Sequence, residues 1–295
     1  KPYIDVRNSF NSFIPNSLSR NLHDNLVSFY LKKLNDRPEL QDKIEFDIVY
    51  TCYDLSYDER SKELLNSNFK KEAIIELKNA LINLTNNLIL TSKESIKDDL
   101  SSIKKMENDR EKIAEKVKST NITIESLLKN SKFLLDDCRK KGTVQFSRLA
   151  RLGFIGKIIL KSLIKKGIID QNFYDNFMGS ISTVATDINE DFKHMASGNI
   201  TQEEFIKKYY HLRPGSYDIT SLRYESHPDL IRTMHLEIQD SPKSNFSLTT
   251  EQDSKITLAL KKEGLKFNAK TLLEFARKSL ESREYAKFEF TKNLS

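Results

Sequence analysis

The stretch KKEAIIELKNALINLTNNLIL, residues 70–90, indicates the fold class. It places Ile74, Leu77, Leu81, Leu84 and Leu88 on a single stripe. Apolar residues that recur every three or four positions form one face of an α-helix. The spacing therefore predicts a long amphipathic helix whose stripe faces a core.

Helical periodicity continues along most of the chain after this stretch. Gly142 and Gly167 follow two of the predicted helices, and glycine is the usual residue just past a helix end. Thr201 and Glu204 have the spacing of a capping box, which predicts a helix start. Residues 212–248 show no periodicity and are predicted to be a long loop, and loops of that length are usually functional or disordered. Two last helices are predicted at 250–262 and from 268 to the end.

The first 55 residues have a different pattern. PYIDVRNSF and KIEFDIVYTCYDL alternate apolar with polar residues and are rich in β-branched and aromatic side chains, as strands are. The residues between them have helical spacing. We therefore predict a mainly α fold with a small strand-helix-strand element over residues 1–55 and a helical domain over residues 56–295.

The composition limits the possible classes of protein. The chain has 295 residues, 38% hydrophobic residues and 31% charged residues, and no apolar run approaches the length of a membrane span. The net charge of +6 comes from lysines spread along the chain, without an arginine-rich arm, so we expect no nucleic-acid partner and no membrane partner. Only two cysteines are present, which favours a reducing, cytoplasmic location. The chain opens without a methionine or a leader, and we expect it to be excised from a longer polypeptide.

The common cofactor and nucleophile motifs are absent from the sequence. Neither GxGxxG nor GxxxxGK[ST] occurs, GxSxG is missing, and the five histidines form no HExxH or other paired set. Cys52 and Cys138 stand alone, so there is no zinc spacing. We therefore expect neither a metal nor a cofactor in this chain.

Polar residues near the N-terminus form the first candidate site. In IDVRNSFNSFIP, Asp5 and Arg7 would lie on one face of the predicted strand, and Asn11 and Ser12 follow. The alternative is an ordinary ion pair at a strand edge.

Two arginines form the second candidate. Arg148 and Arg151 are three apart in FSRLARLGFIGK and hence neighbours on one helical face. A solvated face is the simple alternative. The segment is otherwise apolar, however, and a partly buried guanidinium needs an anionic or carbonyl partner.

The third candidate is HLRPGSYDI, residues 211–219. Pro214 and Gly215 favour a turn, which would let His211, Arg213 and Asp218 converge. An arginine fork suits a carboxylate or a phosphate, and an imidazole can relay a proton. The alternative is a hydrogen-bonded loop that closes a helix end.

Together, PYIDVRNSFNSFIP, DKIEF, FSRLARLGFIGK, HLRPGSYDI and AKFEFTKNLS resemble the middle region of phosphoenolpyruvate synthase-like and pyruvate phosphate dikinase-like proteins. The resemblance covers essentially the whole chain, in motif order. It points to the branch found in surface-polysaccharide gene clusters, whose architecture is similar to that of rifamycin phosphotransferases. Those proteins combine an ATP-grasp domain, a helical substrate-binding domain and a swivelling phosphohistidine domain.

The resemblance implies the activity of the whole polypeptide. ATP and magnesium would bind in a separate ATP-grasp domain, which residues 1–55 would help to complete. The mobile histidine would carry the phosphoryl group to an acceptor held in the helical domain, with AMP and phosphate as the other products. One member of the branch is an L-glutamine kinase of capsule phosphoramidate synthesis, so L-glutamine is the expected acceptor.

The roles of single residues are hypotheses within this resemblance. Arg148, Arg151 or Arg7 would hold the carboxylate of the acceptor, and Glu45 or Asp218 its ammonium group. His211 and Arg213 would face the phosphohistidine, and Asp5 or Asp218 would take the amide proton. The remaining predicted substrate-binding residues are Asn11, Ser12 and Tyr217.

The chain departs from the family pattern at three positions. Tyr210 stands where glycine is usual, Ser216 where threonine is usual, and Gln41 where histidine is common. None of these decides the acceptor. Pyruvate or another small acceptor, an apolar antibiotic, and a non-catalytic interdomain scaffold remain the alternatives.

Overall fold

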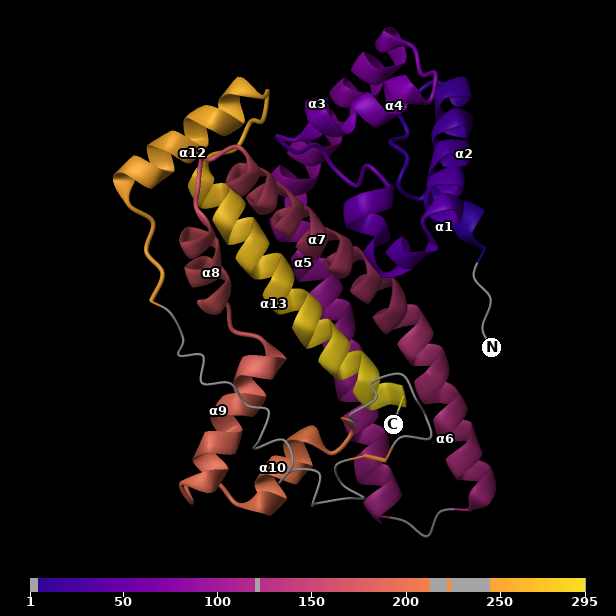
Figure 1. The fold of residues 1–295 in the computed structure, drawn as a ribbon. Helices are drawn as coiled ribbons and strands as arrows, with labels where there is room; N and C mark the ends of the chain where they lie inside the picture. Colours follow the sequence, from indigo (N-terminus) through magenta and orange to yellow (C-terminus); the bar gives the residue numbers. More distant parts are fainter. Residues whose placement is uncertain (1–4, 120–122, 213–221, 224–244, 295) are drawn as a thin grey trace. The chain divides into compact units, whose positions relative to one another are not determined.

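A computed structural model describes residues 5–119, 123–212, 222–223 and 245–294 of the chain. The described elements are helices (Figure 1), which confirms the predicted mainly α fold. The chain divides into two compact units, each assembled from three stretches of sequence. The first unit takes residues up to 94, 151–176 and 246–278, and the second takes the rest. Three long helices contribute residues to both units: α5 (Lys71–Ser119), α7 (Val144–Lys165) and α13 (Ala269–Leu294).

The first predicted strand is wrong, because residues 6–11 form the short helix α1 (Val6–Asn11). Asp5 caps this helix: its Oδ1 accepts from the backbone amide of Asn8 at 3.1 Å, and its Oδ2 accepts from the Asn8 side chain at 2.7 Å. Such a cap satisfies an otherwise unpaired amide of the first turn. This local bond outweighs the weak strand preference of an alternating pattern.

The helix predicted after it is confirmed. It is α2 (Arg20–Asp36), which buries Leu22, Leu26 and Tyr30. The second predicted strand is also wrong, so the strand-helix-strand element is not supported. In its place the chain forms the 3₁₀ helix η1 (Pro38–Lys43) and the π-helix η2 (Ile44–Ile48).

Residues 48–57 explain the second error. All ten are buried, so the segment has no solvent face and cannot follow the alternation of a half-buried strand. Several of its amides donate to side chains instead of a strand ladder. The amide of Tyr50 donates to the Tyr30 hydroxyl at 3.3 Å, and that of Tyr53 to Thr85 Oγ1 at 2.9 Å.

Helices complete the first unit around this buried segment. They are α3 (Tyr57–Arg60), α4 (Lys62–Asn66), most of α8 (Gln171–Gly179), α12 (Thr250–Lys262), and the parts of α5, α7 and α13 that belong to this unit. In α7 a Cβ on Gly156 would lie 3.0 Å from the Cα of Ala276 in α13, so glycine permits the close approach of these two helices. Gly167, at φ 65°, follows the end of α7 as predicted.

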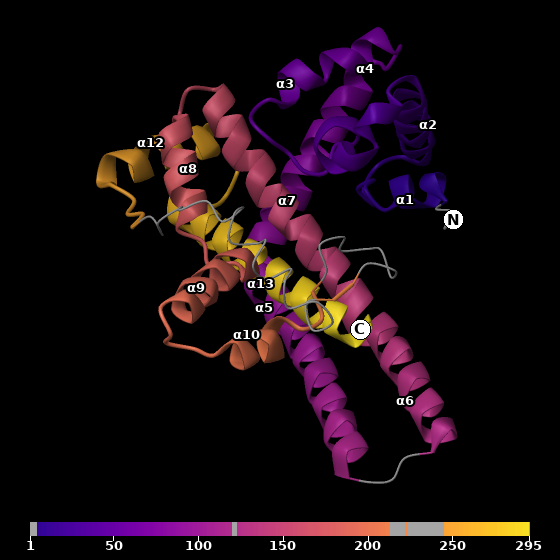
Figure 2. The same ribbon diagram turned by 60° about the horizontal axis from the view of Figure 1, so that its bottom comes forward.

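The second unit contains α6 (Ile124–Asp137), the π-helix η3 (Cys138–Thr143), α9 (Val184–Ala196) and α10 (Gln202–Tyr209). Helices α9 and α10 lie side by side (Figure 2), with the rings of Phe192 and Phe205 in edge contact at 6.1 Å. The predicted capping box at the start of α10 is confirmed, since Thr201 Oγ1 accepts from the Glu204 amide and Glu204 Oε2 from the Thr201 amide.

Gly142 does not end a helix as predicted. The chain continues through η3 directly into α7, and Gly142 is absent from the residues with positive φ. A Cβ there would lie 3.1 Å from Met106 Sδ and 3.2 Å from a ring carbon of Phe290. Close packing therefore explains this glycine.

No described helix is both long enough and apolar enough to cross a membrane.

Candidate functional site

Arg151 in α7 contacts the turn that follows α1, within the first unit. Its Nη1 donates to the backbone carbonyl of Ser12 at 2.8 Å, and its Nη2 donates to Ser12 Oγ at 2.9 Å. The guanidinium carbon also lies 4.1 Å from the centre of the Phe13 ring. Two hydrogen bonds and an aromatic face thus fix the plane of this guanidinium before any ligand arrives.

The Arg151 guanidinium is charged but has no ion-pair partner within the described part of the chain. Burial lowers the pKa of Arg151, while the negative charge of Glu45 acts in the opposite direction. Arginine nonetheless stays protonated in proteins and has five N–H donors, of which Ser12 takes two. A partly desolvated cation with free donors is suited to bind an anionic group such as a carboxylate.

Glu45 lies near Arg151 because η2 packs against α7. The rings of Phe46 in η2 and Phe154 in α7 meet edge to face at 5.2 Å. The backbone carbonyl of Glu45 accepts a hydrogen bond from Thr51 Oγ1 at 2.7 Å, which holds the turn of η2 in place. We call Ser12, Phe13, Glu45 and Arg151 the Arg151 site. Three of its four members were predicted from the sequence at separate positions.

The other N-terminal candidates have simpler surroundings. Asp5 is engaged as the cap of α1, and Arg7 and Asn11 are exposed on that helix. The predicted placement of Asp5 and Arg7 on one face of a strand is wrong, because the residues form a helix start. Asn11 directly precedes Ser12 and thus remains next to the Arg151 site.

Arg148 does not join the Arg151 site, and it belongs to the second unit. It forms a charge-assisted pair with Asp99, in which both its Nε and Nη2 donate to the carboxylate. The Asp99 side chain is only 2% exposed, so Arg148 neutralises a buried charge. The hydrogen bonds that Arg148 donates to Asp99 raise the pKa of Arg148. Because Arg148 is already paired with Asp99, it is less suited than Arg151 to hold a ligand carboxylate.

His211 is buried in the second unit. The residue is 2% exposed, and its ring lies 4.6 Å from that of Phe288, centre to centre. Burial, with smaller effects from the positive charges of Lys292 and Arg110, lowers the pKa of His211 to about 3. The imidazole is therefore neutral near pH 7. Its predicted role beside a phosphohistidine stays a prediction, and Arg213, Tyr217 and Asp218 lie outside the described residues.

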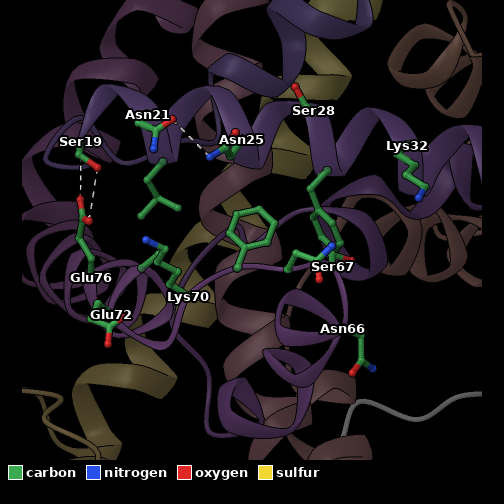
Figure 3. A pocket seen from close by; sticks show the side chains of 15 residues that line it. Ser19, Asn21, Asn25, Ser28, Lys32, Asn66, Ser67, Lys70, Glu72 and Glu76 are labelled. Carbon is green, nitrogen blue, oxygen red and sulfur yellow. Dashed lines mark hydrogen bonds between the residues drawn. The ribbon is translucent and has the colours of Figure 1, made fainter.

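A cavity of about 720 Å³ lies between α2 and the junction of α4 with α5 (Figure 3). Its rim carries amide and hydroxyl groups, including Asn21 and Asn25, and Glu76 is engaged there by the amide of Ser19 at 2.7 Å. None of the predicted site residues lines it. Its two lysines and two glutamates balance, so its charge favours neither an anion nor a cation.

Sequence reasoning did not single out Phe13, the aromatic face under Arg151. The sequence could have indicated Phe13, because it directly follows the predicted ligand-binding Ser12 and an aromatic ring is a common stacking partner for arginine. The described residues contain no group of three or more His, Cys, Asp or Glu side chains that could hold a metal ion.

Comparisons with known proteins do not extend this description: no family model, no curated protein and no solved structure matches the chain. The resemblance to the phosphoenolpyruvate synthase-like proteins rests on the five quoted motifs and their order.

Proposed function

We propose that this chain binds the acceptor substrate of an ATP-dependent phosphotransferase of the phosphoenolpyruvate synthase-like kind, and that the acceptor is L-glutamine. ATP, magnesium and the phosphohistidine belong to other domains of the same polypeptide. The motif order supports the type of chemistry, and the Arg151 site supports the class of acceptor. A cytoplasmic location is part of the same proposal.

The observation that carries the proposal is a fixed guanidinium without a carboxylate partner in the described residues, close to a glutamate. The α-carboxylate and α-ammonium groups of an amino acid are separated by a single carbon. Arg151 is suited to hold the first with its free donors, and Glu45 to attract the second. Pyruvate has no ammonium group, and the charge of Glu45 would repel it. The pair therefore favours an amino acid over pyruvate.

The chemistry follows from the transfer itself. The side-chain amide nitrogen of glutamine attacks phosphorus, the bond between phosphorus and the histidine nitrogen breaks, and a carboxylate takes the amide proton. Asp218 is the preferred candidate for this base, because Asp5 is engaged as a helix cap. Arg213 would stabilise the charge on the phosphoryl group during transfer. Positioning by the Arg151 site supplies much of the rate, as in phosphoryl transfer generally.

The test is AMP formation by the complete polypeptide in the presence of ATP and one acceptor at a time. We expect L-glutamine to be required, and L-glutamate, L-asparagine and pyruvate to be inactive. Arg213→Ala is expected to abolish turnover without unfolding the protein, and Arg151→Gln to raise KM for glutamine by about tenfold or more. AMP formation that is independent of glutamine, or an Arg213→Ala enzyme with normal turnover, would overturn the proposal. An inactive, correctly folded protein would favour the scaffold alternative.

A further inference from the structure

A second polar cavity lies in the first unit, where η1 and η2 meet α7. Its volume is about 480 Å³, which is in the range of small-molecule sites. Lys43 comes from η1, Ser56 from the buried segment, and Lys161 and Lys165 from α7. We call the cavity lined by these residues and Arg60 the α7 pocket. It shares no residue with the Arg151 site.

The hydroxyl group of Ser56 is the first sign of a ligand. Ser56 lines the pocket and is 2% exposed, and its Oγ has no hydrogen-bond partner among the described residues. Its backbone amide, by contrast, donates to Asp54 Oδ1 at 2.8 Å. A buried hydroxyl without a partner is unfavourable and calls for an explanation such as a water, an ion or a ligand. A ligand oxygen in the pocket would satisfy it.

The lysines are the second sign. Within the described residues, no carboxylate lies within ion-pair distance of Lys43, Lys161 or Lys165. The adjacent Lys166, in contrast, reaches Glu59 at 2.7 Å. Lys161 and Lys165 are one helical turn apart on the same face of α7, where two ammonium groups repel each other. An anion in the pocket would relieve that repulsion.

The acidic residues of the pocket do not cancel this charge. Asp54 is 3% exposed at its side chain and is neutralised by Arg60, whose Nη1 lies 2.8 Å from its carboxylate. With that pair set aside, three lysines stand against Asp42 and Asp47, and all five residues are exposed. The lining therefore keeps one net positive charge, which favours an anion.

We propose that the α7 pocket binds a small phosphorylated molecule through Lys161, Lys165 and the Ser56 hydroxyl. A phosphate group offers three oxygens to these three donors, and lysine is a common point-charge partner for phosphate. The cavity is larger than a phosphate ion, which leaves room for an organic group beside Phe46 and Ile158. The proposal goes beyond the proposed function and does not depend on it. Arg151 and Lys161 are ten residues apart, about 15 Å along α7.

The experiment is calorimetric titration of O-phospho-L-serine and inorganic phosphate, with L-serine as the unphosphorylated control. The variants are Lys161→Gln, Lys165→Gln and Ser56→Ala, and Lys166→Gln is a control with the same loss of charge at the residue directly after α7. We expect both phosphate compounds to bind and L-serine not to bind. Each of the two pocket lysine variants should weaken binding about tenfold, and Ser56→Ala about threefold or more. Lys166→Gln should stay within about twofold of the unmodified chain.

Thermal unfolding separates binding from folding. Ser56→Ala removes a hydroxyl that has no partner among the described residues, so it should not lower Tm, yet it should reduce the rise in Tm caused by O-phospho-L-serine. The proposal is overturned if neither phosphate compound binds at about 10 mM, or if L-serine binds equally well. It is also overturned if Lys166→Gln weakens binding as much as Lys161→Gln, since that indicates a general effect of positive charge.

Discussion

Asp99 is a buried carboxylate that forms an ion pair with Arg148. Replacement by alanine (Arg148→Ala) leaves that charge without its hydrogen bonds, and we expect a loss of about 1–3 kcal/mol in the free energy of unfolding. Arg139→Ala is the matched control, because the pair of Arg139 with Asp136 is exposed and should contribute less than about 1 kcal/mol. Urea denaturation measures both. Equal losses would show that Asp99 does not depend on Arg148.

His211 gives a prediction about pH. Its pKa is about 3 in the folded chain and ordinarily 6.5, so the unfolded chain binds more protons between these values. The stabilisation from neutral His211 is complete above pH 6.5 and is lost as the pH falls toward 3. In this window the free energy of unfolding should fall more steeply than in His211→Leu, by at most about 1.4 kcal/mol per pH unit.

Urea denaturation at pH 7.0, 6.0, 5.0 and 4.0 checks this, and the slopes are compared rather than the absolute stabilities, because His211→Leu also changes the packing against Phe288. Parallel slopes in the two proteins would contradict a buried neutral imidazole.

Residue identity and spacing alone cannot separate Arg148 from Arg151. The sequence placed both on one helical face, which is correct, but their partners are distant in the chain. Asp99 precedes Arg148 by 49 residues, and Ser12 precedes Arg151 by 139. Such long-range contacts depend on the packing of the elements. The sequence therefore identified both arginines as candidates but could not show which one is suited to bind a ligand.

At the scale of elements, two glycines of neighbouring helical segments should respond differently to alanine. In Gly156→Ala the new Cβ meets the backbone of Ala276 at 3.0 Å, and backbone in a packed helix cannot yield cheaply. We expect a loss of about 1–3 kcal/mol in the free energy of unfolding.

Gly142→Ala is the comparison, because its new Cβ meets the flexible Met106 side chain at 3.1 Å and alanine favours helix. Thermal unfolding should rank Gly156→Ala well below Gly142→Ala. The opposite order would contradict the close approach of α7 and α13 at Gly156.

The elements also show where sequence patterns succeed and fail. The helices at 250–262 and 269–294 were predicted almost to the residue. The strands failed because alternation in short segments is a weak signal. Asp5 capped a helix in the first case, and in the second the whole segment 48–57 was buried, with side-chain partners for several of its amides.

At the scale of the whole molecule, the composition of the sequence does not mark the boundary between the two units. Domain boundaries are usually sought in linkers rich in glycine, proline or polar residues. Here α5, α7 and α13 pass from one unit to the other without any interruption of the helix. The predicted role of residues 1–55 in completing an ATP-grasp domain stays a prediction. The Arg151 site, by contrast, lies entirely in one unit and can be tested there.

Calorimetric titration of L-glutamine into this chain tests the central claim most directly. Unmodified chain, Arg151→Gln, and Arg37→Gln are compared, where Arg37 forms an exposed pair with Glu39 and serves as the control. We predict selective heat for glutamine over L-glutamate and pyruvate, affinity at least about tenfold weaker in Arg151→Gln, and unchanged affinity in Arg37→Gln. Circular dichroism confirms that each variant is folded. Equal affinity in a folded Arg151→Gln chain, or no binding of glutamine by the unmodified chain, would contradict the account.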